Sequence, residues 1–155
     1  MEPFFHDLLN RFDALHEDIK KSIHGLSPEA LDWMPAGETN SINVLVTHLA
    51  AAEKFWAVDI PLGKDSDRER PKEFLVSGLQ ESELIQILDT TLEELVFAFE
   101  KMTVADLEQM RHSKQHQKDM TAGWAILHAL EHTAIHVGQI QLTVQILERT
   151  TQDET

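Results

Sequence analysis

Apolar residues recur at intervals of three and four along four long stretches of the chain, and no stretch shows the sustained alternation of a strand. In the first stretch, one stripe holds Phe5, Leu8, Phe12, Leu15, Ile19 and Ile23. The four predicted helices cover residues 3–23, 41–58, 81–101 and 121–149. Longer connections separate the second from the third helix and the third from the fourth. We therefore expect an all-α fold, a four-helix bundle.

Short extra helical turns are predicted in the connections. Ser27 as a cap and Pro28 at a first helical position indicate one turn over residues 27–31. A second turn is expected early in residues 102–120, followed by a polar loop over 111–118. The charged stretch 64–72 is interpreted as a solvent loop, and the tail 150–155 is expected to be loose. With no internal repeat or composition shift, we expect residues 1–155 to form a single domain.

The composition excludes several functions. The 155 residues include no cysteine, so the chain has no disulfide, thiolate ligand or cysteine nucleophile. A net charge of −14 would repel a nucleic-acid backbone or an anionic membrane surface. No apolar run approaches the roughly 18 residues of a membrane span, and the N-terminus lacks the pattern of a signal peptide. We expect a cytoplasmic protein that binds neither nucleic acid nor membrane.

His48 lies near the centre of the apolar arc of the second predicted helix, with Val44 and Ala52 one turn to either side. A polar ring in that position loses its water and needs a partner. Taken alone, the position favours an ordinary core histidine that bonds to a backbone carbonyl or a carboxylate.

The last predicted helix carries His128, His132 and His136 at intervals of four. Residues at i and i+4 share one helix face, so two neighbouring imidazoles can converge on one ion. The three rings lie between two apolar arcs, within a face that we expect to be buried. His128 and His136 differ by about 80° in azimuth. The ligating pair is therefore either His128–His132 or His132–His136, and the periodicity leaves both open.

A buried pair on the last helix, together with His48 on another helix, favours a metal site. Protonated imidazoles would repel one another in a poorly solvated place, whereas neutral imidazole is both the form that burial favours and the form that binds a metal. Three protein ligands leave positions open for water or substrate, as catalytic sites do. Nitrogen ligands suit zinc, nickel, copper or iron. We expect one divalent ion from this set of four, with zinc or nickel as the preferred interpretation.

Two motifs carry a family resemblance. The start of the second helix reads Trp33-Met34-Pro35-Ala36-Gly37, then Asn40-Ser41-Ile42 and Val46-Thr47-His48-Leu49-Ala50. The last helix contains His128-Ala129-Leu130-Glu131-His132-Thr133-Ala134-Ile135-His136-Val137-Gly138-Gln139-Ile140. Over about residues 4–149, the chain resembles the DinB/YfiT-like superfamily of metal-dependent enzymes. The resemblance implies a bundle, often dimeric, in which the metal ligands are His48, His132 and His136.

The resemblance also implies a class of chemistry. Characterised relatives include thiol-dependent S-transferases and isomerases, in which a metal activates a low-molecular-weight thiol. A coordinated thiol loses its proton near neutral pH and becomes a nucleophile. Because this chain has no cysteine, the thiol would be a cosubstrate. Water attacking a small ester or amide is the hydrolytic variant of the same chemistry.

Several residues are candidates for supporting this site. Gln139, three residues after His136, is placed to orient a ligand or touch substrate. Glu53 and Glu131 are candidate acceptors for ring N–H groups, although a solvated face is the preferred interpretation for both. His16 borders the apolar stripe of the first helix, where packing is the preferred interpretation. No role is assigned to the histidines on polar faces or in loops, namely His6, His24, His112 and His116.

We thus expect a metal-dependent enzyme, an S-transferase acting on small electrophilic molecules. The alternatives are a hydrolase of a small ester or amide, a non-catalytic metal-binding, stress-associated dimer, and a helical interaction module with satisfied core histidines. A second apolar arc on the last helix, around Trp124, Ile135 and Leu142, exceeds what one side of a bundle needs. This arc predicts a homodimer unless the segment 102–120 covers it.

Overall fold

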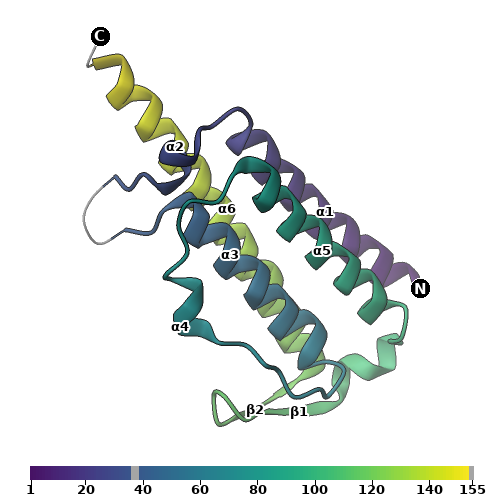
Figure 1. Cartoon of the computed structure of the whole chain (residues 1–155). Helices are drawn as coiled ribbons and strands as arrows, with labels where there is room; N and C mark the ends of the chain where they lie inside the picture. The colour runs from purple at the N-terminus through teal and green to yellow at the C-terminus, as the bar shows by residue number, and fades with distance from the viewer. Residues whose placement is uncertain (36–38, 154–155) are drawn as a thin grey trace.

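The computed structural model describes residues 1–35 and 39–153, and it confirms the predicted four-helix bundle (Figure 1). Its long helices are α1 (Pro3–Ile23), α3 (Ile42–Glu53), α5 (Glu81–Phe99) and α6 (Ala122–Asp153). A π-helix, η1 (Lys54–Asp59), continues α3 without a break. The connections hold the short helices α2 (Pro28–Asp32), α4 (Arg70–Glu73) and η2 (Val104–Glu108), and the strands β1 (Met110–Ser113) and β2 (Lys118–Thr121).

The cap predicted at Ser27 is confirmed, and α3 begins with a cap of the same kind. The hydroxyl of Ser27 accepts a hydrogen bond from the backbone N–H of Ala30, and the hydroxyl of Ser41 accepts one from Val44. Each bond satisfies one of the N–H groups that the first turn of a helix leaves without a partner. The cap at Ser41 fixes where α3, the helix that carries His48, begins.

The connections differ from the prediction in two places. The predicted polar loop 111–118 is instead an antiparallel hairpin, in which Arg111 lies opposite Met120 and Gln117 closes the turn with a φ of +48°. Its strands are held from outside: Met120 is buried in the core, and Arg111 donates to the carbonyl of Pro61. Such tertiary contacts leave no periodic signal in four-residue strands.

The predicted solvent loop 64–72 is also wrong in part. It leads into α4, and the side chain of Arg68 is only 6% exposed. The last helix extends further than predicted, since α6 includes residues 150–153 of the expected loose tail. Residues 154 and 155 lie outside the described residues, as do Ala36 and Gly37 of the first family motif.

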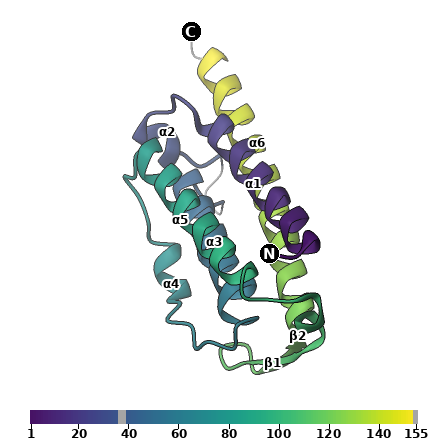
Figure 2. The ribbon, with the colours of Figure 1, turned by 90° about the vertical axis from the view of Figure 1, so that its right-hand side faces the viewer.

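Two apolar clusters fill the bundle, one near the hairpin and one toward the opposite end. The first includes Phe5, Phe12 and Phe99, and the second includes Ile19, Leu84 and Ile140, among others. α6 packs against both α1 and α3. Figure 2 shows the hairpin closing one end of the bundle, while the C-terminal part of α6 projects beyond the other. Within the described residues, no helix is long and apolar enough to cross a membrane.

Candidate metal centre

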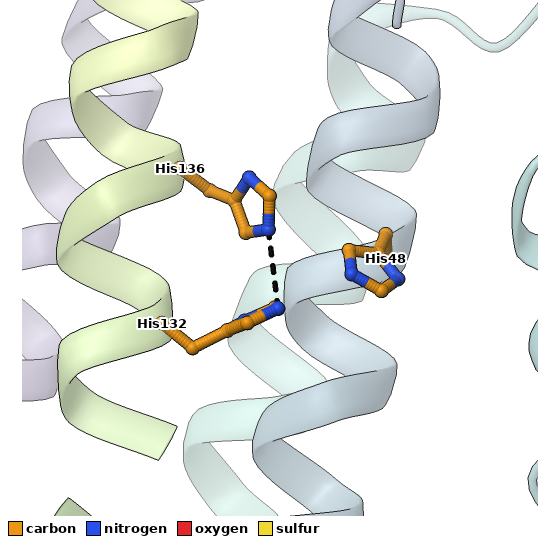
Figure 3. A group of neighbouring side chains, drawn as sticks. All are labelled: His48, His132 and His136. Carbon is orange, nitrogen blue, oxygen red and sulfur yellow. Dashed lines mark hydrogen bonds between the residues drawn. The ribbon is translucent and has the colours of Figure 1, made fainter. Parts of the chain in front are cut away.

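Three histidine rings meet between α3 and α6 (Figure 3). His48 comes from α3, and His132 and His136 come from successive turns of α6. One nitrogen of each ring lies within 4.8 Å of the other two. The ring centroids of His48 lie 5.0 Å from that of His132 and 5.2 Å from that of His136. We call these three residues the histidine triad.

His128, the fourth candidate, points elsewhere. Its ring stacks on Trp124 with centroids 5.0 Å apart and an angle of 11° between the planes, and it lies edge-on to Trp56. Its centroid is 6.1 Å from that of His132, whereas His132 and His136 are 4.3 Å apart. Of the two pairs that the periodicity allowed, the structure therefore brings His132 and His136 to His48.

Burial keeps the triad neutral. It lowers the pKa of His48, His132 and His136, because a charged imidazolium loses its hydration. The effect is largest for His132, where burial and then the neighbouring rings of His136 and His48 lower the pKa to about 3. All three rings are therefore neutral at pH 7, which is the state in which imidazole can ligate a metal.

Glu73 and Arg68 orient His48. The Nδ1 atom of His48 lies 2.7 Å from a carboxylate oxygen of Glu73. Arg68 donates two hydrogen bonds to the same carboxylate, at 2.6 and 2.8 Å. Burial raises the pKa of Glu73, but the bonds from Arg68 and His48 outweigh it and hold that pKa below its usual value. Because Glu73 is ionised, Nδ1 of His48 donates and Nε2 keeps a free lone pair.

In the other two rings, Nε2 is the nitrogen that is directed at a neighbouring histidine of the triad. The Nδ1 atom of His136 lies 2.6 Å from the amide oxygen of Gln139, so the predicted contact of Gln139 with this site exists. The Nδ1 atom of His132 is buried and has no partner among the described residues. The Nε2 atoms of His132 and His136 face each other at 3.2 Å.

This arrangement fits a metal ion. Lone pairs that face each other at 3.2 Å repel unless a proton or a cation lies between them. Zinc–nitrogen bonds of about 2.0–2.1 Å in tetrahedral geometry place two ligand nitrogens about 3.3 Å apart, close to the 3.2 Å between the Nε2 atoms of His132 and His136. A metal-ligating histidine usually donates its other N–H to a carboxylate or an amide, as His48 and His136 do.

The predicted supporting carboxylates lie away from the triad. Glu131 is exposed, as expected. Glu53 is fully buried, so its assignment to a solvated face is wrong. Its carboxylate bonds to Nε2 of His16 at 2.9 and 3.1 Å and accepts a hydrogen bond from Thr133 at 2.7 Å. Glu53 thus supports a histidine ring, but that ring is His16 and not a member of the triad.

A cavity of about 400 Å³ adjoins the triad. His48 and His132 form part of its wall, and Trp56, Trp124 and His128 form another part. We call it the aromatic cavity. A ligand in it reaches two of the three histidines, which is the arrangement that a site with open coordination positions requires.

Sequence reasoning missed Glu73, Arg68 and His116. His116, on the hairpin turn, lines the aromatic cavity with its ring 4.8 Å from that of Trp56. One signal could have found Glu73: Pro71 follows Arg70 within a charged stretch, and proline favours the first turn of a helix. No local signal in the sequence indicates that His116 approaches Trp56.

Solved structures share this fold. The DinB-like protein YjoA from Bacillus subtilis matches with a TM-score of 0.69 and 17% identity over 92% of each chain. YfiT from Bacillus subtilis, described as "a probable metal-dependent hydrolase with an unusual four-helix bundle topology", matches with a TM-score of 0.61 and 12% identity, over 90% of this chain and 87% of its own. The mycothiol-dependent maleylpyruvate isomerase matches with a TM-score of 0.63 and 13% identity, over 90% of this chain and 63% of its own.

At identities of 12% to 17%, these likenesses show that the chain shares the fold of these proteins. No curated protein matches the chain by sequence. The sequence does match, over residues 1–153, the family described as "Protein of unknown function (DUF1572)". The chain therefore belongs to the DUF1572 family and has the DinB-like fold that its two motifs predicted.

Proposed function

We propose that this protein binds one divalent metal ion, zinc or nickel, through His48, His132 and His136, and that it is a thiol-dependent S-transferase acting on small electrophilic molecules. The observation that carries the proposal is the convergence of three neutral imidazoles, two of which, His48 and His132, line a cavity. The likeness in fold to a mycothiol-dependent isomerase supports the thiol, which must be supplied as a cosubstrate because the chain has no cysteine.

The residues around the triad have separate roles in this proposal. His48, His132 and His136 present their Nε2 lone pairs to the ion. Glu73 fixes the tautomer of His48, and Gln139 accepts from His136. When bound, a divalent ion supplies Lewis acidity that lowers the pKa of a thiol or a water toward neutrality.

The aromatic cavity holds the electrophile beside the thiol. Two of its walls, Trp56 and Trp124, offer the electrophile an apolar aromatic surface. The thiol releases its proton to solvent, its sulfur forms a bond to the electrophilic carbon, and the leaving group departs with the electron pair of the broken bond.

Hydrolysis is the second candidate, and a specific observation favours it. YfiT, which shares the fold, is described as "a probable metal-dependent hydrolase". The same triad and cavity would serve, with water in place of the thiol and a small ester or amide in place of the electrophile. A non-catalytic, stress-associated metal-binding protein is the outcome if neither reaction is found.

Metal content tests the first part of the proposal. We expect the untagged protein, reconstituted with zinc or nickel and dialysed, to hold one ion per chain. His48→Ala and His132→Ala should each lose it, because two imidazoles bind far more weakly than three. His112→Ala is the matched control, since His112 is an exposed histidine on the hairpin that pairs with Asp119. A wild-type protein without metal, or variants with as much metal as the control, would overturn the proposal.

Activity tests the second part. We expect the metal-loaded protein to conjugate a chloronitroarene with at least one low-molecular-weight thiol, and His132→Ala to reduce the rate to background. A nitrophenyl ester without thiol tests hydrolysis in parallel. Metal-dependent ester cleavage without thiol transfer would favour the hydrolase, and no reaction in either assay would favour a binding protein.

Three further predictions concern the assembly and its surroundings. Trp124, Ile135 and Leu142 remain 39%, 55% and 56% exposed on α6, which supports a homodimer through this face. Light scattering that shows a monomer across the micromolar range would contradict it.

The net charge of −14 supports the absence of nucleic-acid binding, and the lack of cysteine is in keeping with the cytoplasm.

A further inference from the structure

The aromatic cavity carries positive charge in a strongly acidic protein. The whole chain has 27 acidic against 13 basic residues. The described residues that line this cavity nevertheless include Arg68, Arg70 and Lys118, and none of them is Asp or Glu. Because acidic residues outnumber basic ones about two to one in the whole chain, a wall with three cations and no carboxylate is a local reversal of charge.

Two of these cations are unpaired. Arg68 is already neutralised by its two hydrogen bonds to Glu73. Neither Arg70 nor Lys118 forms an ion pair with any residue that the structure describes. Each lies over an aromatic ring instead: Arg70 is 5.0 Å from the centre of Phe74, and Lys118 is 4.1 Å from the centre of a Trp124 ring. Their charges are therefore held at the cavity without being cancelled.

These cations act on a common space although they come from separate segments. Arg70 belongs to α4, and Lys118 belongs to β2. His116, on the cavity wall, lies close enough for both charges to affect its pKa. Burial has the largest effect in lowering that pKa, and the charges of Arg68, Arg70 and Lys118 lower it further. The nearest acidic neighbours along the chain are occupied, since Glu69 pairs with Lys72 and Asp119 pairs with His112.

Flat rings form the rest of the wall. Trp56 and Trp124 meet edge to face with centroids 5.8 Å apart, and His128 stacks on Trp124. Such surfaces favour a planar apolar group, and the cations favour an anion beside it. Phe74, which carries Arg70 on its ring, also lies 4.8 Å from the ring of His48. One ligand can thus contact both the cations and the triad.

We propose that the aromatic cavity binds a small molecule whose anionic group, a carboxylate or a phosphate, lies against Arg70 and Lys118 while a flat apolar part lies against Trp56 and Trp124. Because it names the substrate class of the same site, this inference rests on the proposed function. The anion belongs either to the electrophile or to the thiol cosubstrate, and the experiments below separate these sources.

Binding of matched benzene derivatives tests the charge preference. We expect calorimetry on the metal-loaded full chain to give a Kd for benzoate about fivefold or more below that for benzamide, since two exposed charge contacts each contribute modestly. Arg70→Gln/Lys118→Gln should abolish the preference. The control Lys72→Gln/Lys114→Gln changes the net charge equally at cations that are exposed and paired with Glu69 and Asp65, and it should keep the preference.

A further variant separates anion binding from metal binding. His132→Ala should keep the preference for benzoate even though it loses the metal, because the cations hold the anion. Loss of the preference in His132→Ala, its survival in Arg70→Gln/Lys118→Gln, or equal binding of benzoate and benzamide would each overturn this inference. If the preference survives in Arg70→Gln/Lys118→Gln, or if benzoate and benzamide bind equally, the metal content of the wild-type protein still tests the proposed function separately.

Kinetics then assign the anion to one of the two sources. An anionic thiol with a neutral electrophile is compared with a neutral thiol and an anionic electrophile. Arg70→Gln/Lys118→Gln should raise the KM of the component whose anion lies in the cavity about fivefold and leave the KM of the other unchanged. A fall in kcat with both KM values unchanged would overturn the inference.

Discussion

Among the described residues, two buried histidine–glutamate pairs differ in their surroundings. His16 and Glu53 are both fully buried, and the carboxylate also accepts a hydrogen bond from Thr133. His48 and Glu73 are bonded at 2.7 Å, and His48 lies at the wall of the aromatic cavity beside two further imidazoles. The first pair is enclosed by the core, whereas the second faces a space that a ligand can enter.

The enclosed pair joins three helices. His16 comes from α1, Glu53 from α3 and Thr133 from α6, and along α1 His16 lies between Phe12 of one apolar cluster and Ile19 of the other. Each polar atom of Glu53 finds a donor within this set. Such a layer specifies how the helices align, because a shift of any one of them would leave buried groups without partners.

The open pair prepares one histidine for a ligand. Glu73 and Arg68 fix the orientation of His48, and the ring nitrogen that they leave free points toward His132 and His136. The same two residue types therefore support structure in one place and candidate chemistry in the other. The difference lies in the neighbouring rings and the adjoining cavity.

The largest expected effect comes from breaking the enclosed pair. Glu53→Ala should lower the free energy of unfolding by roughly 3–5 kcal/mol, because it leaves His16 without its partner in the core. Zinc stoichiometry in the folded fraction should stay at the wild-type value. Chemical denaturation and metal analysis measure the two quantities.

Glu131→Ala is the matched control for Glu53→Ala, because Glu131 is an exposed glutamate on a neighbouring helix. It should change the free energy of unfolding by less than about 0.5 kcal/mol. A Glu53→Ala protein that is as stable as this control, or that loses its metal while still folded, would contradict the structural role of the enclosed pair.

Breaking the open pair should affect the metal more than the fold. Glu73→Gln keeps the shape of the side chain but removes the charge that orients His48, so zinc affinity should fall about 10- to 100-fold. Competition with a chromogenic chelator measures it. Glu69→Gln, an exposed change one residue before α4, should leave the zinc affinity unaltered. Equal losses in the two variants would contradict the assignment of Glu73 as the residue that orients His48.

The metal-free protein should lose stability in acid through the triad. The pKa of His132 is lowered from 6.5 to about 3 in the folded state. Below pH 6.5 the unfolded chain therefore binds a proton that the folded chain does not, and stability falls as the pH drops from about 6.5 toward 3. The slope approaches about 1.4 kcal/mol per pH unit for this one group.

Denaturation in the presence of a chelator at pH 7 and pH 5 measures this slope. His132→Ala removes the group and should give a shallower dependence than the wild type. Equal slopes in the two proteins would show that His132 does not carry the effect. Exposed histidines such as His112 provide the comparison, and His112→Ala should keep the wild-type slope.

The smallest effect is expected at Gln139. Its amide oxygen accepts from Nδ1 of His136, and the residue is exposed. Gln139→Ala should weaken zinc binding about 2- to 10-fold, the effect of one neutral hydrogen bond. Gln141→Ala, an exposed change on the same helix, should leave the affinity as it is. A larger loss than that of Glu73→Gln would reverse the order of importance inferred for the two orienting residues.

Much of the bundle could be predicted because its helices are long and amphipathic. The caps at Ser27 and Ser41 and the stripes of α1 and α5 follow local rules that act within a few residues. The hairpin and α4 could not be predicted in this way. Their short segments are held by contacts with distant residues, such as Arg111 with Pro61 and Glu73 with His48.

The candidate site shows the same division between what local sequence signals predict and what tertiary contacts decide. The sequence alone determined that His48 is buried in an apolar arc and that His132 and His136 share a face of one helix, because helical periodicity converts spacing into direction. Only the tertiary structure decided that these faces meet, that His128 stacks on Trp124 instead, and that Glu53 bonds to His16. Those outcomes depend on how α3 and α6 pack, and packing brings together residues whose separation in the sequence carries no signal.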